Sequence, residues 1–201
     1  MPARSGSKAE QTAATTRKLV EVGRELFAAR GFAHTGTEDL VRAAGVTRGA
    51  LYHHFADKTA LFHAVLDQVQ REVGAAVEEV AARYDNPWDQ LTSGCRAFLE
   101  ACTRPDTQQI MLIDGPAVLG WSAWRQMDSQ YSFQSLREGV SVLVRDGVIA
   151  DQSVDALAHL LSGAMNEAAL WVVQSATPAA TLIEATESLG RLLAALRIQP
   201  G

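Results

Sequence analysis

The chain has 201 residues, 47% of them hydrophobic and 20% charged, with a formal net charge of −5, which is typical of a globular protein that buries a core. No apolar run reaches the roughly 18 residues that cross a bilayer, and the polar start MPARSGSKAE lacks the apolar stretch of a secretory signal. We therefore expect a cytoplasmic protein with no membrane partner. Cys95 and Cys102 match no metal-binding or redox spacing, and we expect reduced thiols, no metal and no cofactor.

The whole chain after a short polar start predicts helices. Residues 1–10 are expected to form a flexible arm. Beyond it, apolar residues recur every three or four positions, and N-cap residue types such as Thr37, Thr47 and Asp57 precede several of these stretches. About nine helices are predicted, over residues 11–30, 37–44, 48–55, 58–84, about 87–102, a shorter piece ending near 113, about 118–145, 153–174 and 178–196. No alternating strand pattern interrupts them, so we expect an all-α protein.

Charge is distributed unevenly between the two parts of the chain. Residues 1–58 contain nine Lys/Arg against six Asp/Glu, whereas residues 59–201 contain nine against seventeen. A basic head on an acidic body favours a contact between the head and a polyanion.

Residues 37–58 have the spacing of a helix-turn-helix motif. Gly45 permits the tight turn, and Leu51 and Phe55, four positions apart, can fasten the short third helix to the core. The opposite side of that helix then carries side chains suited to DNA, because arginine reads guanine, small residues allow close approach, and hydroxyls suit phosphate oxygens. Packing between helices is the alternative for Tyr52 and His53. A metal site at His53 is disfavoured, since adjacent helical residues point about 100° apart.

The segment TRKLVEVGRELFAARGFAHTGTEDLVRAAGVTRGALYHHFADKTALFHAVL resembles the DNA-binding domain of TetR-family transcriptional regulators, over about residues 11–66. The pattern G-V-T-x-G-x-L-Y-x-H-F-x-x-K-x-x-L, from Gly45 to Leu61, is highly specific for that family. The resemblance implies phosphate contacts for Thr37, Thr47, Tyr52 and Lys58. It implies base-facing or groove-facing positions for Arg48, Gly49, Ala50 and His53. His54 receives no role.

The same resemblance implies a division of the chain and a function. Residues 11–57 would form the helix-turn-helix DNA-binding domain, and residues 58–201 a helical ligand-binding and dimerisation domain. The implied protein is a regulator, by family default a repressor, that binds a palindromic double-stranded DNA operator as a homodimer. A small lipophilic effector would release the protein from DNA by favouring a conformation in which the two DNA-reading helices of the dimer, residues 48–55 of each subunit, have the wrong spacing for the operator.

The last two predicted helices are the expected dimer surface, because their apolar residues cover more than one side. Burial within one subunit is the alternative for them. The residues concerned are Leu157, Leu160, Leu161, Ala164, Ala168, Trp171, Leu182, Leu189, Leu192 and Leu193.

An effector pocket should combine apolar side chains with a few polar groups, and the middle of the chain offers such a set. Ordinary core packing is the alternative for each of these residues. They are Phe62, Leu66, Phe98, Met111, Trp121, Trp124, Met127, Phe133, His159 and Asn166.

Two other functions agree less well with the sequence than a ligand-responsive regulator does. An enzyme is disfavoured, because the sequence contains no phosphate-binding glycine loop, no metal-ligand spacing and no paired catalytic residues. A structural DNA-binding protein without an effector would not need the long segment that follows the helix-turn-helix motif.

Overall fold

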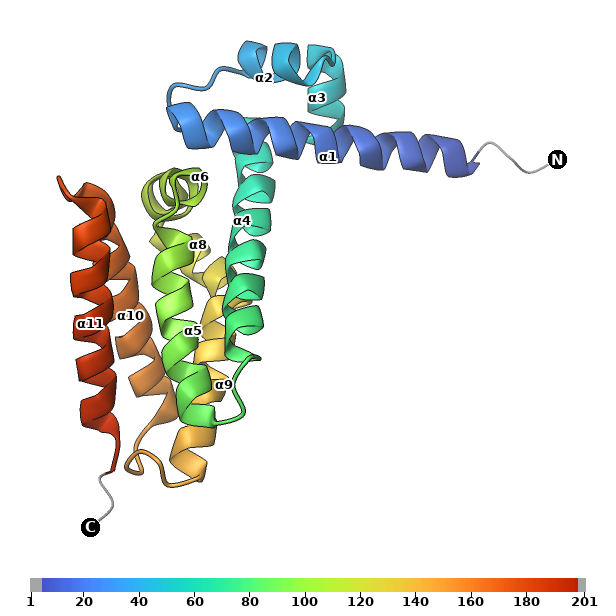
Figure 1. Cartoon of the computed structure of the whole chain (residues 1–201). Helices are drawn as coiled ribbons and strands as arrows, with labels where there is room; N and C mark the ends of the chain where they lie inside the picture. The colour runs from blue at the N-terminus through green and yellow to red at the C-terminus, as the bar shows by residue number, and fades with distance from the viewer. Residues whose placement is uncertain (1–4, 199–201) are drawn as a thin grey trace.

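The computed structural model describes residues 5–198, and within that range the chain folds into helices without a β-strand (Figure 1). An isolated β-bridge joins Ile149 to Arg197. The predicted all-α fold is confirmed. Residues 1–4 of the predicted arm lie outside the described residues, and residues 5–10 form the first turns of α1. The helices are α1 (Ser5–Arg30), α2 (Thr37–Ala44), α3 (Arg48–His54), α4 (Lys58–Ala81), α5 (Pro87–Cys102), α6 (Pro105–Gln108), the π-helix η1 (Gln109–Asp114), α7 (Gly115–Leu119), α8 (Trp121–Asp128), α9 (Ser132–Arg145), α10 (Val154–Gln174) and α11 (Pro178–Leu196).

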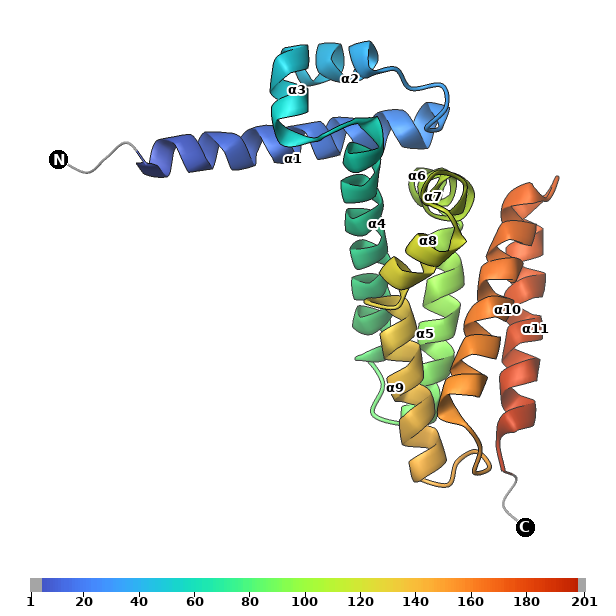
Figure 2. The same ribbon diagram turned by 180° about the vertical axis from the view of Figure 1, so that it is seen from behind.

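Helices α1 to α3 form a head on a longer body made of α4 to α11 (Figures 1 and 2). α2 and α3 lie on the side of α1 that faces away from the body. Leu19, Leu40 and Leu51, one from each helix of the head, are fully buried, so the three helices share one core. The rings of Phe27 on α1 and Phe62 on α4 meet edge to face with centroids 5.3 Å apart, and this contact joins the core of the head to α4.

The body is a bundle in which α4 packs along α5, and α10 packs against α5, α9 and α11. By length and composition alone, α10 could cross a bilayer, but 44% of its apolar stretch is buried inside the molecule. Since Leu161, Met165 and Ala169 all face the bundle core, its hydropathy is accounted for by its place as a core helix.

The predicted helix starts are confirmed at two of the three N-caps named above. The Thr47 hydroxyl accepts from the Ala50 N–H at 3.1 Å, and the Asp57 carboxylate accepts from the Ala60 N–H at 2.7 Å. The prediction for Thr37 is wrong: Gly36 is the N-cap of α2, and Thr37 is its first helical residue. Asp39 accepts from the Gly36 N–H at 3.4 Å, which satisfies the main-chain donor of the N-cap residue. No side chain of the N-cap accepts from the first turn of α2, because Gly36 has none.

The single helix predicted over residues 118–145 is broken between α7 and α8 at Gly120, which has a φ of 80°, and again between α8 and α9 near Tyr131. Tyr131, with φ −127° and ψ −106°, leaves the helical region. Its hydroxyl donates to Asp67 on α4 at 2.7 Å. Its Cβ packs against Gly74 of α4, where a Cβ added to the glycine would lie only 3.2 Å from the Cβ of Tyr131. The second break therefore follows from the docking of Tyr131 on α4, a contact between residues far apart in the chain.

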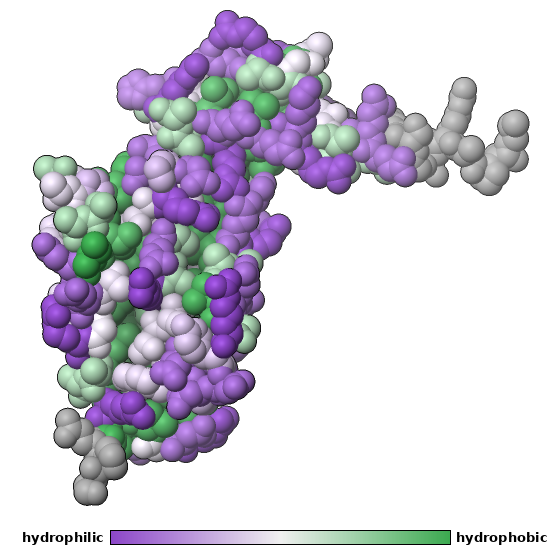
Figure 3. All heavy atoms as spheres, viewed as in Figure 1, coloured by the Kyte–Doolittle hydropathy of each residue, from purple (hydrophilic) through white to green (hydrophobic). Residues whose placement is uncertain are grey.

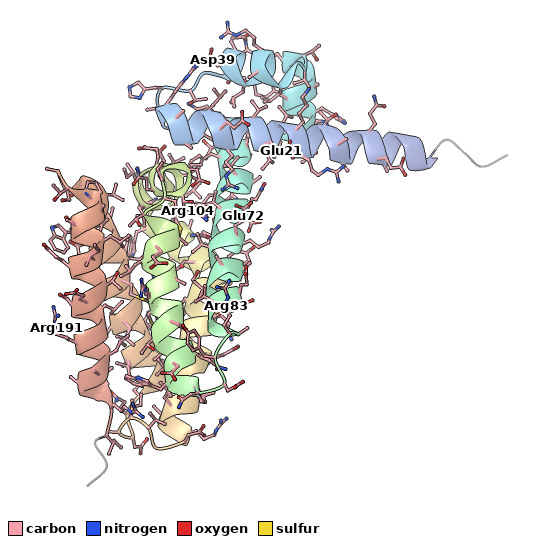
Figure 4. The ribbon with its side chains drawn as sticks, in the orientation of Figure 1. Glu21, Asp39, Glu72, Arg83, Arg104 and Arg191 are labelled. Atoms are coloured by element: carbon pink, nitrogen blue, oxygen red, sulfur yellow. The ribbon has the colours of Figure 1, made fainter. Side chains whose placement is uncertain are left out.

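Polar contacts fasten the head to the body beneath α1. Arg24 on α1 donates to Glu72 on α4 and, at 3.0 Å, to Asp106 on α6. The Asp114 carboxylate at the end of η1 accepts from the Phe32 N–H at 2.7 Å. In Figure 4, Glu72 on α4 and Arg104, the residue before α6, are labelled on segments that lie below α1. A movement of α4, α6 or η1 would consequently move the head as well.

Candidate DNA-binding surface and ligand pocket

The outward side of α3 carries an exposed polar surface. Thr47, Arg48, Gly49 and His53 are exposed, and Tyr52 is 43% exposed. A Cβ on Gly49 would meet only the Thr47 hydroxyl, at 4.0 Å, so another backbone can approach there closely. Leu51 and Phe55 on the opposite side are buried in the head, as predicted.

The other predicted DNA contacts lie at the edge of this surface. Ala50 and Thr37 are half-buried. Arg48 reaches back to Glu38 at 3.2 Å and lies over the Tyr52 ring, 5.7 Å from its centroid. Because both partners of this ion pair are exposed, water can replace the contact at little cost, and the guanidinium remains available to a base or a phosphate.

Lys58 is held by the head itself. Its ammonium donates to the main-chain carbonyls of Phe32 at 2.8 Å and Thr35 at 3.0 Å, and it lies 3.9 Å from the centroid of the Phe32 ring. An ammonium has three N–H donors, so one remains for the phosphate contact that the family resemblance implies. A loss of DNA affinity in Lys58→Ala would therefore not identify a phosphate contact by itself, because the variant would also loosen the loop between α1 and α2.

His54 receives a role that the sequence could not supply. Its Nδ1 lies 3.0 Å from the Thr16 hydroxyl on α1, and the side chain is half-buried. The two adjacent histidines therefore divide their tasks: His53 faces outward, and His54 fastens α3 to α1. Among the described residues, no group of three or more His, Cys, Asp or Glu side chains could hold a metal ion.

The body contains a pocket of about 420 Å³ between α4, α5, α9 and α10, here called the inner pocket. Half of its lining residues are buried, and three of them are exposed at the surface. Burial raises the pKa of the Cys95 thiol to about 12, so this group meets a ligand as a neutral thiol. The apolar part of the lining consists of Val77, Leu91, Cys95, Phe98, Phe133, Leu136, Val142 and Met165.

A second hollow of about 590 Å³, the outer pocket, lies between η1, α7, α8 and α10. Trp121 at its edge is 64% exposed. Asn166 lines it and is buried, and its Oδ1 has no hydrogen-bond partner in the part of the chain that the structure describes.

The ten residues predicted to line one pocket do not come together. Phe98 and Phe133 line the inner pocket, and Trp121, Trp124, His159 and Asn166 line the outer one. The remaining four line neither of these pockets and lie in the buried core: Phe62, Leu66, Met111 and Met127. α4 lines the inner pocket with Val77, Glu78 and Ala81 near its C-terminal end. These residues lie three to four turns beyond Phe62 and Leu66, the two residues of α4 predicted to line the pocket.

A polar cluster separates the two pockets. The Arg125 guanidinium donates to the Asp128 carboxylate at 2.7 Å and to the Ser162 hydroxyl at 3.0 Å. Asp128 and Ser162 line the inner pocket, whereas Arg125 lines the outer one. Burial raises the pKa of Asp128 to about 6, while Arg125 acts in the opposite direction. The burial of this carboxylate thus outweighs the attraction of its partner.

Asp128→Asn should change how the stability of the protein depends on pH. The folded protein holds the Asp128 proton more tightly than the unfolded chain, so the wild-type free energy of unfolding falls as pH rises from about 4 to about 6. Two pKa units correspond to about 3 kcal/mol, and the variant lacks this slope. Urea unfolding across pH 4–7 measures it. Asp155→Asn, which removes an exposed carboxylate paired with Arg137, is the control, and parallel curves for all three proteins would contradict the assignment.

Apolar side chains are also exposed on the outer sides of α10 and α11. Leu160 is 72% exposed and Trp171 50% exposed, and Ala164 lies between them on the same stripe of α10. Figure 3 shows hydrophobic side chains on the surface over the upper part of α11, and Arg191, labelled in Figure 4, marks a polar position on the same helix.

The predicted dimer residues divide between this outer surface and the core. Ala164, Trp171 and Leu192 are exposed, and Ala168 and Leu182 are half-buried. Ile183, which was not predicted, is 62% exposed. Four predicted residues are instead buried within the subunit, because they face α5 and the other helices of the bundle: Leu157, Leu161, Leu189 and Leu193.

Comparisons with known proteins cover both parts of the molecule. A family model described as "Bacterial regulatory proteins, tetR family" matches residues 19–65, and one described as "Tetracyclin repressor-like, C-terminal domain" matches residues 88–196. The chain is 25% identical over 188 residues to the TetC protein of transposon Tn10 from Escherichia coli, which covers 94% of this chain and 91% of that protein. It is 36% identical over 86 residues to the transcriptional regulator AcrR of Shigella flexneri, which covers 42% of this chain and 39% of that protein. The crystal structure of a TetR-family transcriptional regulator from Pectobacterium atrosepticum is similar to it with a TM-score of 0.82 and 33% identity, covering 96% of this chain and 98% of the other.

Proposed function

The chain belongs to the TetR family of bacterial transcriptional regulators, and from that premise we propose that it binds a palindromic DNA operator as a homodimer and is released by a small molecule in the inner pocket. We assign residues 11–57 to DNA binding and residues 58–201 to ligand binding and dimerisation. We assign repression as the direction of control, which is common in this family, and a cytoplasmic location, where the operator is.

The observation that carries the DNA-binding part is the exposed surface of α3. Arg48, Tyr52 and His53 project from a short helix that is anchored by buried residues on its other side. Hydrogen-bonding side chains on a helix of this kind can enter the major groove. The exposed apolar stripe on α10 supports the homodimer, because a large uncovered apolar patch is typical of an interface. A palindromic site requires that twofold symmetry.

The inner pocket supports the sensory part of the proposal over a structural DNA-binding protein without an effector. α4 lines the pocket at its C-terminal end with Val77 and Ala81, and its first residue, Lys58, touches the head. A ligand that moves α4 would therefore change the position of α3. In a dimer, this alters the spacing of the two reading helices, which must match half-sites about 34 Å apart, and DNA affinity falls by linkage.

The operator can be found by selecting bound fragments from random duplexes with the full chain. We expect an inverted repeat, and we expect Arg48→Ala to relax the preference at one position of each half-site by about 1–3 kcal/mol. Arg83→Ala, which removes an exposed arginine from the body (Figure 4), is the matched control. Recovery of the same sequence by Arg48→Ala would show that α3 is not the reading surface, and the absence of any enriched sequence would contradict the function itself.

A further inference from the structure

The charged residues that line the inner pocket all have one sign. Three carboxylates line it, those of Glu78, Asp128 and Glu138, and none of its lining residues is a lysine, an arginine or a histidine. Arg125 lies behind Asp128 and pairs with its carboxylate. The negative charges of Glu78 and Glu138 have no cation among the lining residues. Glu78 and Glu138 are exposed, so water screens their field, whereas the buried Asp128 lies where the effective dielectric constant is lower than that of water.

The three carboxylates occupy different depths. Glu78 and Glu138 are exposed at the mouth, where they accept hydrogen bonds from Ser135 at 3.0 Å and Gln134 at 2.6 Å. Asp128 is only 2% exposed and lies among buried lining residues. An approaching cation thus meets carboxylates at the mouth before it reaches a carboxylate inside.

Asp128 retains the capacity to accept another donor. Its Oδ2 accepts from Arg125, and a carboxylate offers about four lone-pair sites. The Phe98 ring lines the same pocket, and aromatic faces attract cations. The Phe133 ring also lines it, but this ring already lies 5.5 Å from the Arg125 guanidinium and 4.7 Å from the His159 ring. An anionic ligand would meet the uncompensated carboxylates of Glu78 and Glu138 at the mouth.

From these observations we propose that the inner pocket binds a small lipophilic amine, with its protonated nitrogen against the Asp128 carboxylate and its apolar part between α5 and α9. This inference rests on the proposed function, and it adds the chemical class of the effector and the residue that selects it. The apolar lining supplies most of the contact area, and the carboxylate supplies the discrimination between a cation and its neutral or anionic analogues.

The test uses three probes with the same ring and chain: 4-phenylbutylamine, 4-phenylbutan-1-ol and 4-phenylbutanoate. Titration calorimetry on the full-length protein at pH 7.5, without DNA, gives a dissociation constant for each. We expect the amine to bind roughly 10- to 100-fold more tightly than the alcohol, as one hydrogen bond to a charged group allows, and the carboxylate to bind most weakly. Equal affinities for amine and alcohol, tighter binding of the carboxylate, or no binding of the amine would each overturn the proposal.

Variants then locate the selecting group. Asp128→Asn should weaken amine binding roughly 10- to 100-fold and leave alcohol binding within about twofold, which also shows that the pocket is still formed. Asp155→Asn makes the same chemical change outside both pockets and should alter neither affinity. If Asp128→Asn does not fold, the order of the three probes on the wild-type protein decides. Loss of amine binding in Trp121→Ala, with Asp128→Asn unaffected, would place the ligand in the outer pocket and overturn the proposal.

Failure of this inference can be distinguished from failure of the proposed function. A protein that selects an operator but binds the amine no better than the alcohol remains a DNA-binding regulator, and only the ligand class is wrong. A protein that selects the amine through Asp128 but enriches no DNA sequence has the pocket described here and lacks the proposed function.

Discussion

The double variant Leu160→Glu/Trp171→Glu should be a monomer, and it should bind the operator about 100- to 10,000-fold more weakly than the wild-type protein. Both side chains are exposed on the stripe of α10 that faces away from the bundle. A twofold interface uses the same surface on each subunit, so the double substitution would bring four carboxylates together in a buried apolar contact. A monomer contacts one half-site at a time and loses the gain that comes from linking two binding modules.

Sedimentation velocity and fluorescence anisotropy with operator DNA measure the two expected results separately. Ala75→Glu/Ser141→Glu adds the same charge at two exposed positions on α4 and α9 and should remain a dimer with wild-type affinity. A double variant of α10 that is still dimeric would place the interface elsewhere. A monomeric variant with undiminished operator affinity would contradict binding as a dimer.

The sequence predicted most of the helices because their signals are local. Thr47 and Asp57 cap helices through hydrogen bonds that span only three residues, and such signals can be recognised from the sequence alone. The division of the first three helices into an anchored side and an exposed side was predictable for the same reason: Leu51 and Phe55 lie four positions apart on a short helix.

The candidate pocket was predicted poorly because its walls come from segments far apart in the chain. Trp124, Phe133 and His159 are all aromatic or polar residues of the kind that lines a pocket, yet the cluster of Arg125 and Asp128 divides them between two hollows. Asp128 was not among the residues predicted to line a pocket. Its signal was present in WSAWRQMDSQYSF, where an acid stands three residues after an arginine within an aromatic segment, a spacing that places both on one side of a helix.

The dimer surface shows a different limit of the sequence. α10 has apolar residues on more than one side, and periodicity cannot tell which side faces the subunit's own core. Leu161 and Leu160 are adjacent in the chain, but the first is 3% exposed and the second 72% exposed. Only the placement of α10 against α5, α9 and α11 decides between them.

Trp124→Ala should lower the free energy of unfolding by about 3–5 kcal/mol, the range for removing a large buried aromatic side chain. The Trp124 side chain is 2% exposed, and its indole N–H donates to the Met111 carbonyl in η1 at 2.9 Å. Its ring also fills the space in front of Gly115, where a Cβ would lie 2.8 Å from the indole. The variant would therefore leave both a cavity and a buried carbonyl without its donor.

Chemical unfolding of the variant beside Trp121→Ala separates burial from residue type, since the two tryptophans lie three positions apart with ring centroids 5.1 Å from each other. Trp121→Ala removes a largely exposed ring and should change stability by no more than about 0.5 kcal/mol. Trp124→Phe should fall between the two, because it keeps most of the apolar volume and loses the hydrogen bond to Met111. Equal losses for Trp121→Ala and Trp124→Ala would contradict the buried position of Trp124. A Trp124→Phe variant as stable as the wild-type protein would show that the hydrogen bond to η1 contributes nothing.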